Sequence, residues 1–210
     1  MLATDSAPSL RTTALVCLTA VVLALIFGWQ NAGLWKEGGA VELATVVTLL
    51  LVTGLFVVHL PRLAFGPQWH LPVLLALFAM RELDFDKRFT ENGILKLRTY
   101  TGDAPLLLKL VGAGVIALAL VCLYRLVARN RRDFVAALRA GHRWAILITV
   151  GTVVAIVAKG IDGLGRKLAP FGIEVSEAQG MLAGAVEESL EFSFAVALLL
   201  SLLLWLRRNA

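Results

Sequence analysis

Long apolar stretches separated by short polar ones dominate the chain from one end to the other. About 20 residues, at about 1.5 Å per residue in a helix, cross a hydrocarbon layer of about 30 Å. On this criterion the pattern predicts six transmembrane helices, at residues 13–30, 40–60, 67–86, 104–127, 144–163 and 181–206. The chain is therefore predicted to be an all-α polytopic membrane protein, a single six-helix bundle over residues 1–210.

The third predicted span differs from the others because its uninterrupted apolar core, LPVLLALFAM, has only ten residues. A full-length span must continue through Arg81, Glu82 and Asp84, which places charged groups at membrane depth. A long loop follows, in which Asn92 and Gly93 form a turn signal and ILKLRTY alternates enough to allow a short strand or a surface-lying segment.

Composition supports a membrane protein. Hydrophobic residues make up 59% of the chain and charged residues 17%, with a mean hydropathy of +0.80, which exceeds what a soluble domain of 210 residues can bury. Two cysteines and three scattered histidines do not form a zinc-site pattern. The excess of basic over acidic residues, 20 against 15, follows from the topology below and needs no nucleic-acid partner.

Arginines set the expected orientation. The segment from Arg125 to Arg143 carries six arginines, and Arg207 and Arg208 end the last span. The positive-inside rule places both segments in the cytoplasm, and six spans place the N-terminus there too, in a membrane expected to be the bacterial cytoplasmic (inner) membrane. The stretch RDFVAALRAGHRW is expected to lie along the membrane surface, with its arginines among anionic lipid headgroups.

Acidic residues then gather at the opposite ends of the second, third, fifth and sixth predicted helices. Eight of the fifteen share this layer: Glu42, Glu82, Asp84, Asp86, Asp162, Glu187, Glu188 and Glu191. On the last helix, carboxylates and small residues fall within an arc of about 100°. Ionisable groups avoid acyl chains, so this arc is expected to face the interior of the bundle.

Two pairs of carboxylates lie one helical turn apart, Glu82 with Asp86 and Glu187 with Glu191. Such pairs repel, so each needs a counter-charge, a bound cation or a proton. The basic residues expected to balance charge or hold an anionic group are Arg81, Lys159 and Arg166. Sequence spacing also allows local pairing, of Asp84 with Arg81 and Arg88, and of Asp162 with Lys159 and Arg166.

Three interpretations of the acidic layer remain open. In the first, a site centred on Glu82, Asp86, Glu187 and Glu191, with Glu42, Asp162 and Glu188 as secondary ligands or relays, binds a divalent cation (Ca, Mg, Mn or Zn) or relays protons for transport. In the second, the protein is an enzyme, a metal-dependent membrane-embedded hydrolase or transferase acting on a lipid or another amphiphile. In the third, a salt-bridge network stabilises a structural or partner-binding subunit. The expected partners are membrane lipids and either a second copy or another membrane protein.

Overall fold

The computed structural model of the chain describes residues 10–34, 39–59, 66–90 and 93–209. Every regular element in these ranges is a helix, and they include no strand. The chain forms two compact units, one of Met1–Thr48 with Leu138–Ala210 and one of Leu49–Ala137. The single domain expected over residues 1–210 stays a prediction.

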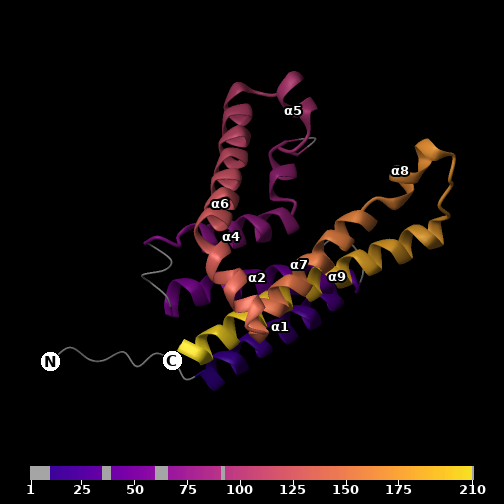
Figure 1. The fold of residues 1–210 in the computed structure, drawn as a ribbon. Coiled ribbons are helices and arrows are strands. Elements are labelled where there is room, and N and C mark those ends of the chain that lie inside the picture. Colours follow the sequence, from indigo (N-terminus) through magenta and orange to yellow (C-terminus); the bar gives the residue numbers. More distant parts are fainter. Residues whose placement is uncertain (1–9, 35–38, 60–65, 91–92, 210) are drawn as a thin grey trace. The chain divides into compact units, whose positions relative to one another are not determined.

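Five helices in the described ranges are long and apolar enough to cross a membrane (Figure 1). They are α1 (Leu10–Ala32), α2 (Ala40–His59), α6 (Leu106–Arg139), α7 (Arg143–Ile161) and α9 (Glu177–Asn209). Each coincides with one of the predicted spans, although α6 and α9 run beyond theirs. The all-helical fold predicted from the sequence is confirmed in the described ranges, and the five long apolar helices support a membrane protein.

The third predicted span, residues 67–86, is not one continuous helix. Helix α4 covers only His70–Glu82, whose 13 residues reach about 20 Å, short of the hydrocarbon layer of about 30 Å. Asp84 then adopts a left-handed backbone conformation with a φ of 46°, and the 3₁₀ turn η1 (Phe85–Arg88) follows. Aspartate tolerates this conformation better than most residues because its short polar side chain bonds locally. The count of six spans is therefore not confirmed within the described residues.

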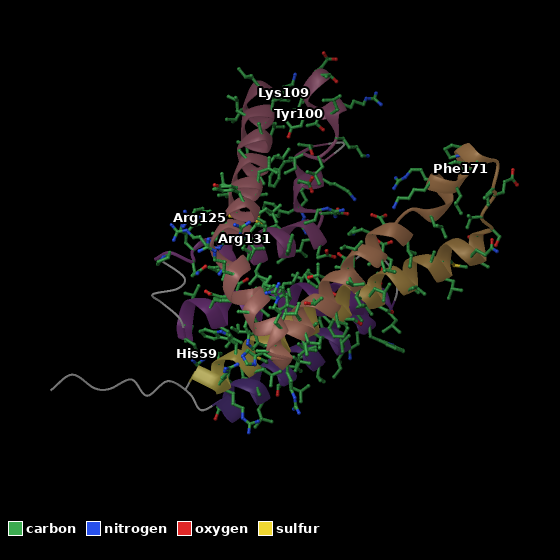
Figure 2. The ribbon with its side chains drawn as sticks, viewed as in Figure 1. His59, Tyr100, Lys109, Arg125, Arg131 and Phe171 are labelled. Atoms are coloured by element: carbon green, nitrogen blue, oxygen red, sulfur yellow. The ribbon has the colours of Figure 1, made fainter. Side chains whose placement is uncertain are left out.

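In the loop after η1, the short strand that the alternation of ILKLRTY allowed is not formed, because its last residues belong to a short helix, α5 (Leu97–Thr101). The alternative, a surface-lying segment, stays a prediction. Side chains of α5 hold the loop in place: Thr99 Oγ1 donates to the Gly93 carbonyl and Tyr100 OH to the Ile94 carbonyl, both at 2.7 Å. Tyr100 and Lys109, labelled in Figure 2, flank the start of α6, where Lys109 Nζ donates to the Gly102 carbonyl at 2.7 Å.

The predicted surface-lying helix over RDFVAALRAGHRW was wrong. Helix α6 continues without a break to Arg139 and ends at a tight turn. Gly141 has a φ of 71°, the left-handed conformation that commonly closes a helix, and α7 begins two residues later at Arg143. A helix continues through polar residues until such a signal, so the arginines extend α6 beyond its apolar part as one continuous helix.

In the first unit, α7 and α9 form an antiparallel hairpin with small residues at the contact. Ala145, Ala158 and Ala195 are fully buried. A Cβ atom on Gly151 would lie 3.0 Å from Ala197 Cβ and 3.4 Å from Phe194 Cδ2, so the two helices approach closely there. The hairpin tip contains α8 (Leu164–Leu168) and η2 (Ala169–Phe171), whose Phe171 is exposed (Figure 2).

Helices α1 and α9 also contact each other in this unit. Figure 1 shows their chain directions opposed, so that the first turn of α1 lies near the C-terminal end of α9. At the other end of α1, Gly28 lies against the backbone of Ala40, and the Ala40 amide donates to the Gly33 carbonyl at 3.0 Å. The end of α1 and the first turn of α2 are therefore in close contact.

Candidate functional site

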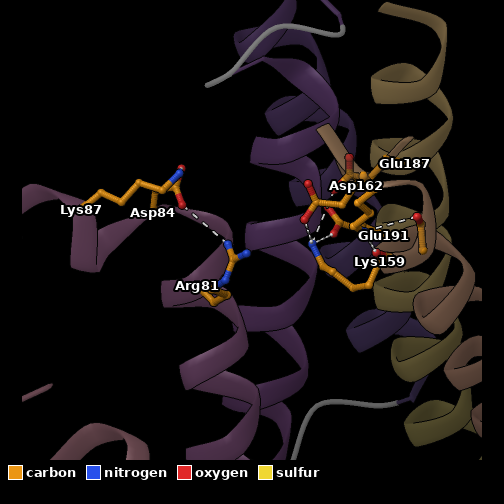
Figure 3. Close-up of polar contacts among 9 residues, drawn as sticks. Arg81, Asp84, Lys87, Lys159, Asp162, Glu187 and Glu191 are labelled. Atoms are coloured by element: carbon orange, nitrogen blue, oxygen red, sulfur yellow. Dashed lines mark hydrogen bonds and ion pairs between the residues drawn. The ribbon is translucent and has the colours of Figure 1, made fainter. Parts of the chain in front are cut away.

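A lysine and three carboxylates meet on the α7–α9 hairpin (Figure 3). Lys159 lies in the last turn of α7 and Asp162 directly follows this helix. Glu187 and Glu191 are four residues apart on α9, so they share one face. Because the hairpin is antiparallel, this face of α9 lies opposite the end of α7.

The Lys159 ammonium is the centre of this lysine–carboxylate cluster. Its Nζ lies 2.5 Å from Glu191 Oε1, 3.5 Å from Glu187 Oε1 and 3.8 Å from Asp162 Oδ2. The contact between Lys159 Nζ and Glu191 Oε1 is an ion pair, but its angles are not those of a hydrogen bond. The side chains of Glu187 and Glu191 are 18% and 14% exposed, whereas those of Lys159 and Asp162 are 47% and 38% exposed. The ammonium thus reaches from a half-exposed position towards two largely buried carboxylates.

The charges in the cluster do not balance. Within the described ranges, Lys159 is the only basic side chain that forms an ion pair with Asp162, Glu187 or Glu191. When all four groups are ionised, one positive charge faces three negative ones. Like charges held this close disfavour full ionisation, so the arrangement favours an added proton or cation.

Arg166 and Lys167 lie beside the cluster but have other roles. Lys167 Nζ donates to the carbonyls of Lys159 at 2.7 Å and Gly160 at 3.3 Å, which caps the C-terminal end of α7. The Arg166 guanidinium folds over Gly163, whose φ is 62° and where a side chain would collide with it. The local pairing of Lys159 with Asp162 is confirmed; the structure gives Arg166 no part in it within the described residues.

The other predicted site residues are spread over both units. Glu42, in the first turn of α2, and Glu188, beside Glu187 on α9, are partly buried in the first unit. Glu82 and Asp86 belong to the second unit. Asp86 Oδ2 accepts the Ile94 amide at 2.8 Å, so this carboxylate holds the loop after η1. The four-residue centre predicted from the sequence stays a prediction.

Asp84 is paired locally, as its spacing predicted, but with a different second partner. Its carboxylate lies 3.6 Å from the Arg81 guanidinium and 2.5 Å from the Lys87 ammonium (Figure 3). Lys87 takes the place expected for Arg88. Arg81 is thus part of a local surface ion pair, which contributes about 0–1 kcal/mol to stability.

The geometry gives no support to the metal site considered from the sequence, or to a serine nucleophile. The described part of the chain contains no group of three or more His, Cys, Asp or Glu side chains that could hold a metal ion. The hydroxyls of Ser189 and Ser193 donate to helix carbonyls one turn earlier, both at 2.7 Å. Neither hydroxyl is directed at a base that could activate it.

A second polar cluster, in the other unit, was missed by the sequence analysis. Asn130 of α6 bridges the first residue of α4 and the turn before it: its Oδ1 contacts His70 Nε2 and its Nδ2 donates to Gln68 Oε1, each at 3.0 Å. His70 is fully buried. One turn away, Arg125 donates to the Pro67 carbonyl at 3.0 Å and lies 5.1 Å from the centre of the Trp69 ring. These partners are about 60 residues apart in sequence, so no local pattern signals them.

Comparisons with protein-family models, with curated proteins and with solved structures found no match to this chain.

Proposed function

We propose that this chain is a proton-relaying membrane protein in which Lys159, Asp162, Glu187 and Glu191 form the proton-binding site. The observation that carries the proposal is the single Lys159 ammonium among three carboxylates, at 2.5, 3.5 and 3.8 Å. Ionisable groups inside apolar helices are costly and commonly mark ion or proton pathways. A proton balances this site more simply than a divalent cation, because the ammonium already occupies the position among the carboxylates.

The depth of the cluster supports access from water. Arg143 and Arg207 lie at the same end of the antiparallel hairpin. Lys159 follows Arg143 by sixteen residues, and Glu191 precedes Arg207 by sixteen. At about 1.5 Å per residue, both are about 24 Å from the arginine end. In a hydrocarbon layer of about 30 Å, the cluster lies close to the opposite boundary, where water reaches it.

Six membrane crossings, with the N- and C-termini both cytoplasmic, belong to the same proposal. The arginine ends of α7 and α9 face the cytoplasm by the positive-inside rule. The opposed directions of α1 and α9 then put the first turn of α1 on that side as well. Helix α2 returns to the cytoplasm and α6 ends there, so the chain between them, residues 60–105, must cross once. Helix α4 is the core of that crossing.

Proton movement into liposomes tests the proposal. The purified protein is reconstituted in vesicles that contain a pH-sensitive dye, and a potassium gradient with valinomycin drives protons inward. We expect faster acidification than in empty vesicles, and a rate lower by at least about tenfold in Glu191→Gln, since a relay depends on each proton-binding group. Glu174→Gln, an exposed carboxylate in the loop before α9, is the matched control and should behave as wild type.

The same flux measurement separates the proposal from a purely structural network. If the ion pairs only join α7 to α9, the wild-type protein gives the flux of empty vesicles, while Glu191→Gln lowers the temperature of unfolding. That combination of results would contradict the proposed function.

A further inference from the structure

The C-terminal part of α6 presents three arginines on one face. Arg125, Arg129 and Arg132 are spaced by four and three residues. At 3.6 residues per turn they fall within an arc of about 60°. Arg131 lies on a different face, about 120° from Arg125; both are labelled in Figure 2.

Arg125 is fixed at the base of this arginine face. It donates to the Pro67 carbonyl at 3.0 Å and stacks on the Trp69 ring, with its guanidinium carbon 5.1 Å from the ring centre. The contacts of Asn130 with Gln68 and His70 hold the same end of α4 against α6. These contacts therefore fix Arg125 against Trp69, and they also fix which side of α6 faces the start of α4.

The position of this pair along α6 places the arginine face at the membrane surface. The preceding part of α6 is apolar and largely exposed, as a lipid-facing span is. Tryptophan prefers the boundary between hydrocarbon and headgroups. Arg129 and Arg132 lie about 6 and about 10 Å further along the helix axis. The headgroup layer is about 5–8 Å thick on each side, so Arg129 falls within it and the backbone of Arg132 lies just beyond it.

The positive charges of the two exposed arginines on this face are not neutralised by nearby carboxylates in the described part of the chain. Arg129 and Arg132 are exposed, and neither forms an ion pair with a carboxylate in the described part of the chain. The planar guanidinium binds two phosphate oxygens at once. At this depth, lipid phosphates are the anionic groups that a membrane supplies.

We propose that Arg125, Arg129 and Arg132, with Trp69, form a binding site for the headgroup of an anionic phospholipid. Trp69 and Arg125 set the depth of the lipid at the hydrocarbon boundary, Arg129 binds its phosphate, and Arg132 adds positive charge at the rim. The inference goes beyond the proposed proton site and shares no residue with it, so either can fail without the other.

Lipid retention by the purified protein tests this site. The protein in neutral detergent is mixed with phosphatidylglycerol or phosphatidylcholine, and bound lipids are counted by native mass spectrometry. Wild type should retain phosphatidylglycerol several-fold more than phosphatidylcholine. Arg129→Gln should lose most of this preference, and Arg131→Gln, with the same change of charge on another face, should keep it. Arg129→Lys should be intermediate, since it keeps the charge but binds oxygen at one point.

Three results would overturn the proposal. Equal retention of the two lipids by wild type would show no headgroup selection, and this comparison needs no variant. An equal loss in Arg131→Gln and Arg129→Gln would show diffuse attraction in place of a site. Displacement of phosphatidylglycerol by an equal concentration of inorganic phosphate would show a site for soluble anions. If Arg129→Gln does not fold, Arg132→Gln replaces it, with partial loss of the preference expected and no loss counting against the site.

Discussion

Lys159 on α7 reaches Glu191 on α9, with 2.5 Å between Nζ and Oε1, and this ion pair joins two helices that are each long and apolar enough to span a membrane. The same ammonium is the only basic partner of Glu187 and Asp162 in the described ranges. Lys159 thus joins α7 to α9, and it also partly neutralises three carboxylates.

Removal of the Lys159 charge should therefore destabilise the hairpin. Lys159→Met leaves two largely buried carboxylates without their ammonium. Loss of one partner costs about 3–5 kcal/mol for a buried pair, but exposed pairs contribute only about 0–1 kcal/mol. Lys159 is half-exposed, so we expect a decrease of about 2 kcal/mol in the free energy of unfolding, measured by chemical unfolding in mixed micelles.

Two further variants make this prediction specific. Lys96→Met removes an exposed lysine before α5 and should change stability by less than about 0.5 kcal/mol. Adding Glu191→Gln to Lys159→Met removes one of the stranded charges and should restore part of the loss. A double variant less stable than Lys159→Met alone would contradict the electrostatic explanation.

The close approach of α7 and α9 at Gly151 gives a second prediction. A side chain there meets Ala197 and Phe194, so Gly151→Leu should separate the helices and lower the free energy of unfolding by about 1–3 kcal/mol. Gly114→Leu on α6, where nothing lies within 4 Å of an added Cβ, is the control and should cause no loss. Equal losses in the two variants would mean that the contact of α7 with α9 at Gly151 does not cause the loss.

The opposed directions of α1 and α9 give a third prediction, on topology. A reporter that is active only in the cytoplasm should be active when fused to either terminus, and inactive when inserted after Asp103, before α6. Active fusions at one terminus alone would mean an odd number of crossings. Residues 60–105 would then remain on one side of the membrane, and α4 would not take part in a crossing.

Much of the fold could be predicted because apolar length alone identifies a spanning helix. The predicted span 40–60 is α2 (Ala40–His59), and 144–163 is α7 (Arg143–Ile161). The break after α4 depends on a left-handed backbone at Asp84, which an aspartate permits but does not require. The extension of α6 through its arginines was missed because an amphipathic segment next to a span can form a separate surface helix or continue the span, and its sequence pattern is the same.

The polar clusters could be predicted only where the spacing is local. Asp162 follows Lys159 by three residues, so their ion pair was visible in the sequence. Contact of Lys159 with Glu187 and Glu191 depends on the register of α7 against α9, which small residues at their contact determine. The contacts of His70 with Asn130 and of Trp69 with Arg125 join residues of α4 and α6 that are far apart in the chain.

Infrared spectroscopy of the cluster tests the central claim most directly, because a protonated carboxylic acid absorbs separately from an ionised carboxylate. We predict that the wild-type protein, reconstituted in lipid at neutral pH, shows a protonated carboxylic acid band that disappears on alkaline titration. The band should be lost or shifted in Glu187→Gln and Glu191→Gln, and unchanged in Glu174→Gln. A wild-type spectrum with only ionised carboxylates at neutral pH, or a band that both cluster variants leave unaltered, would contradict a proton-binding site at Lys159, Asp162, Glu187 and Glu191.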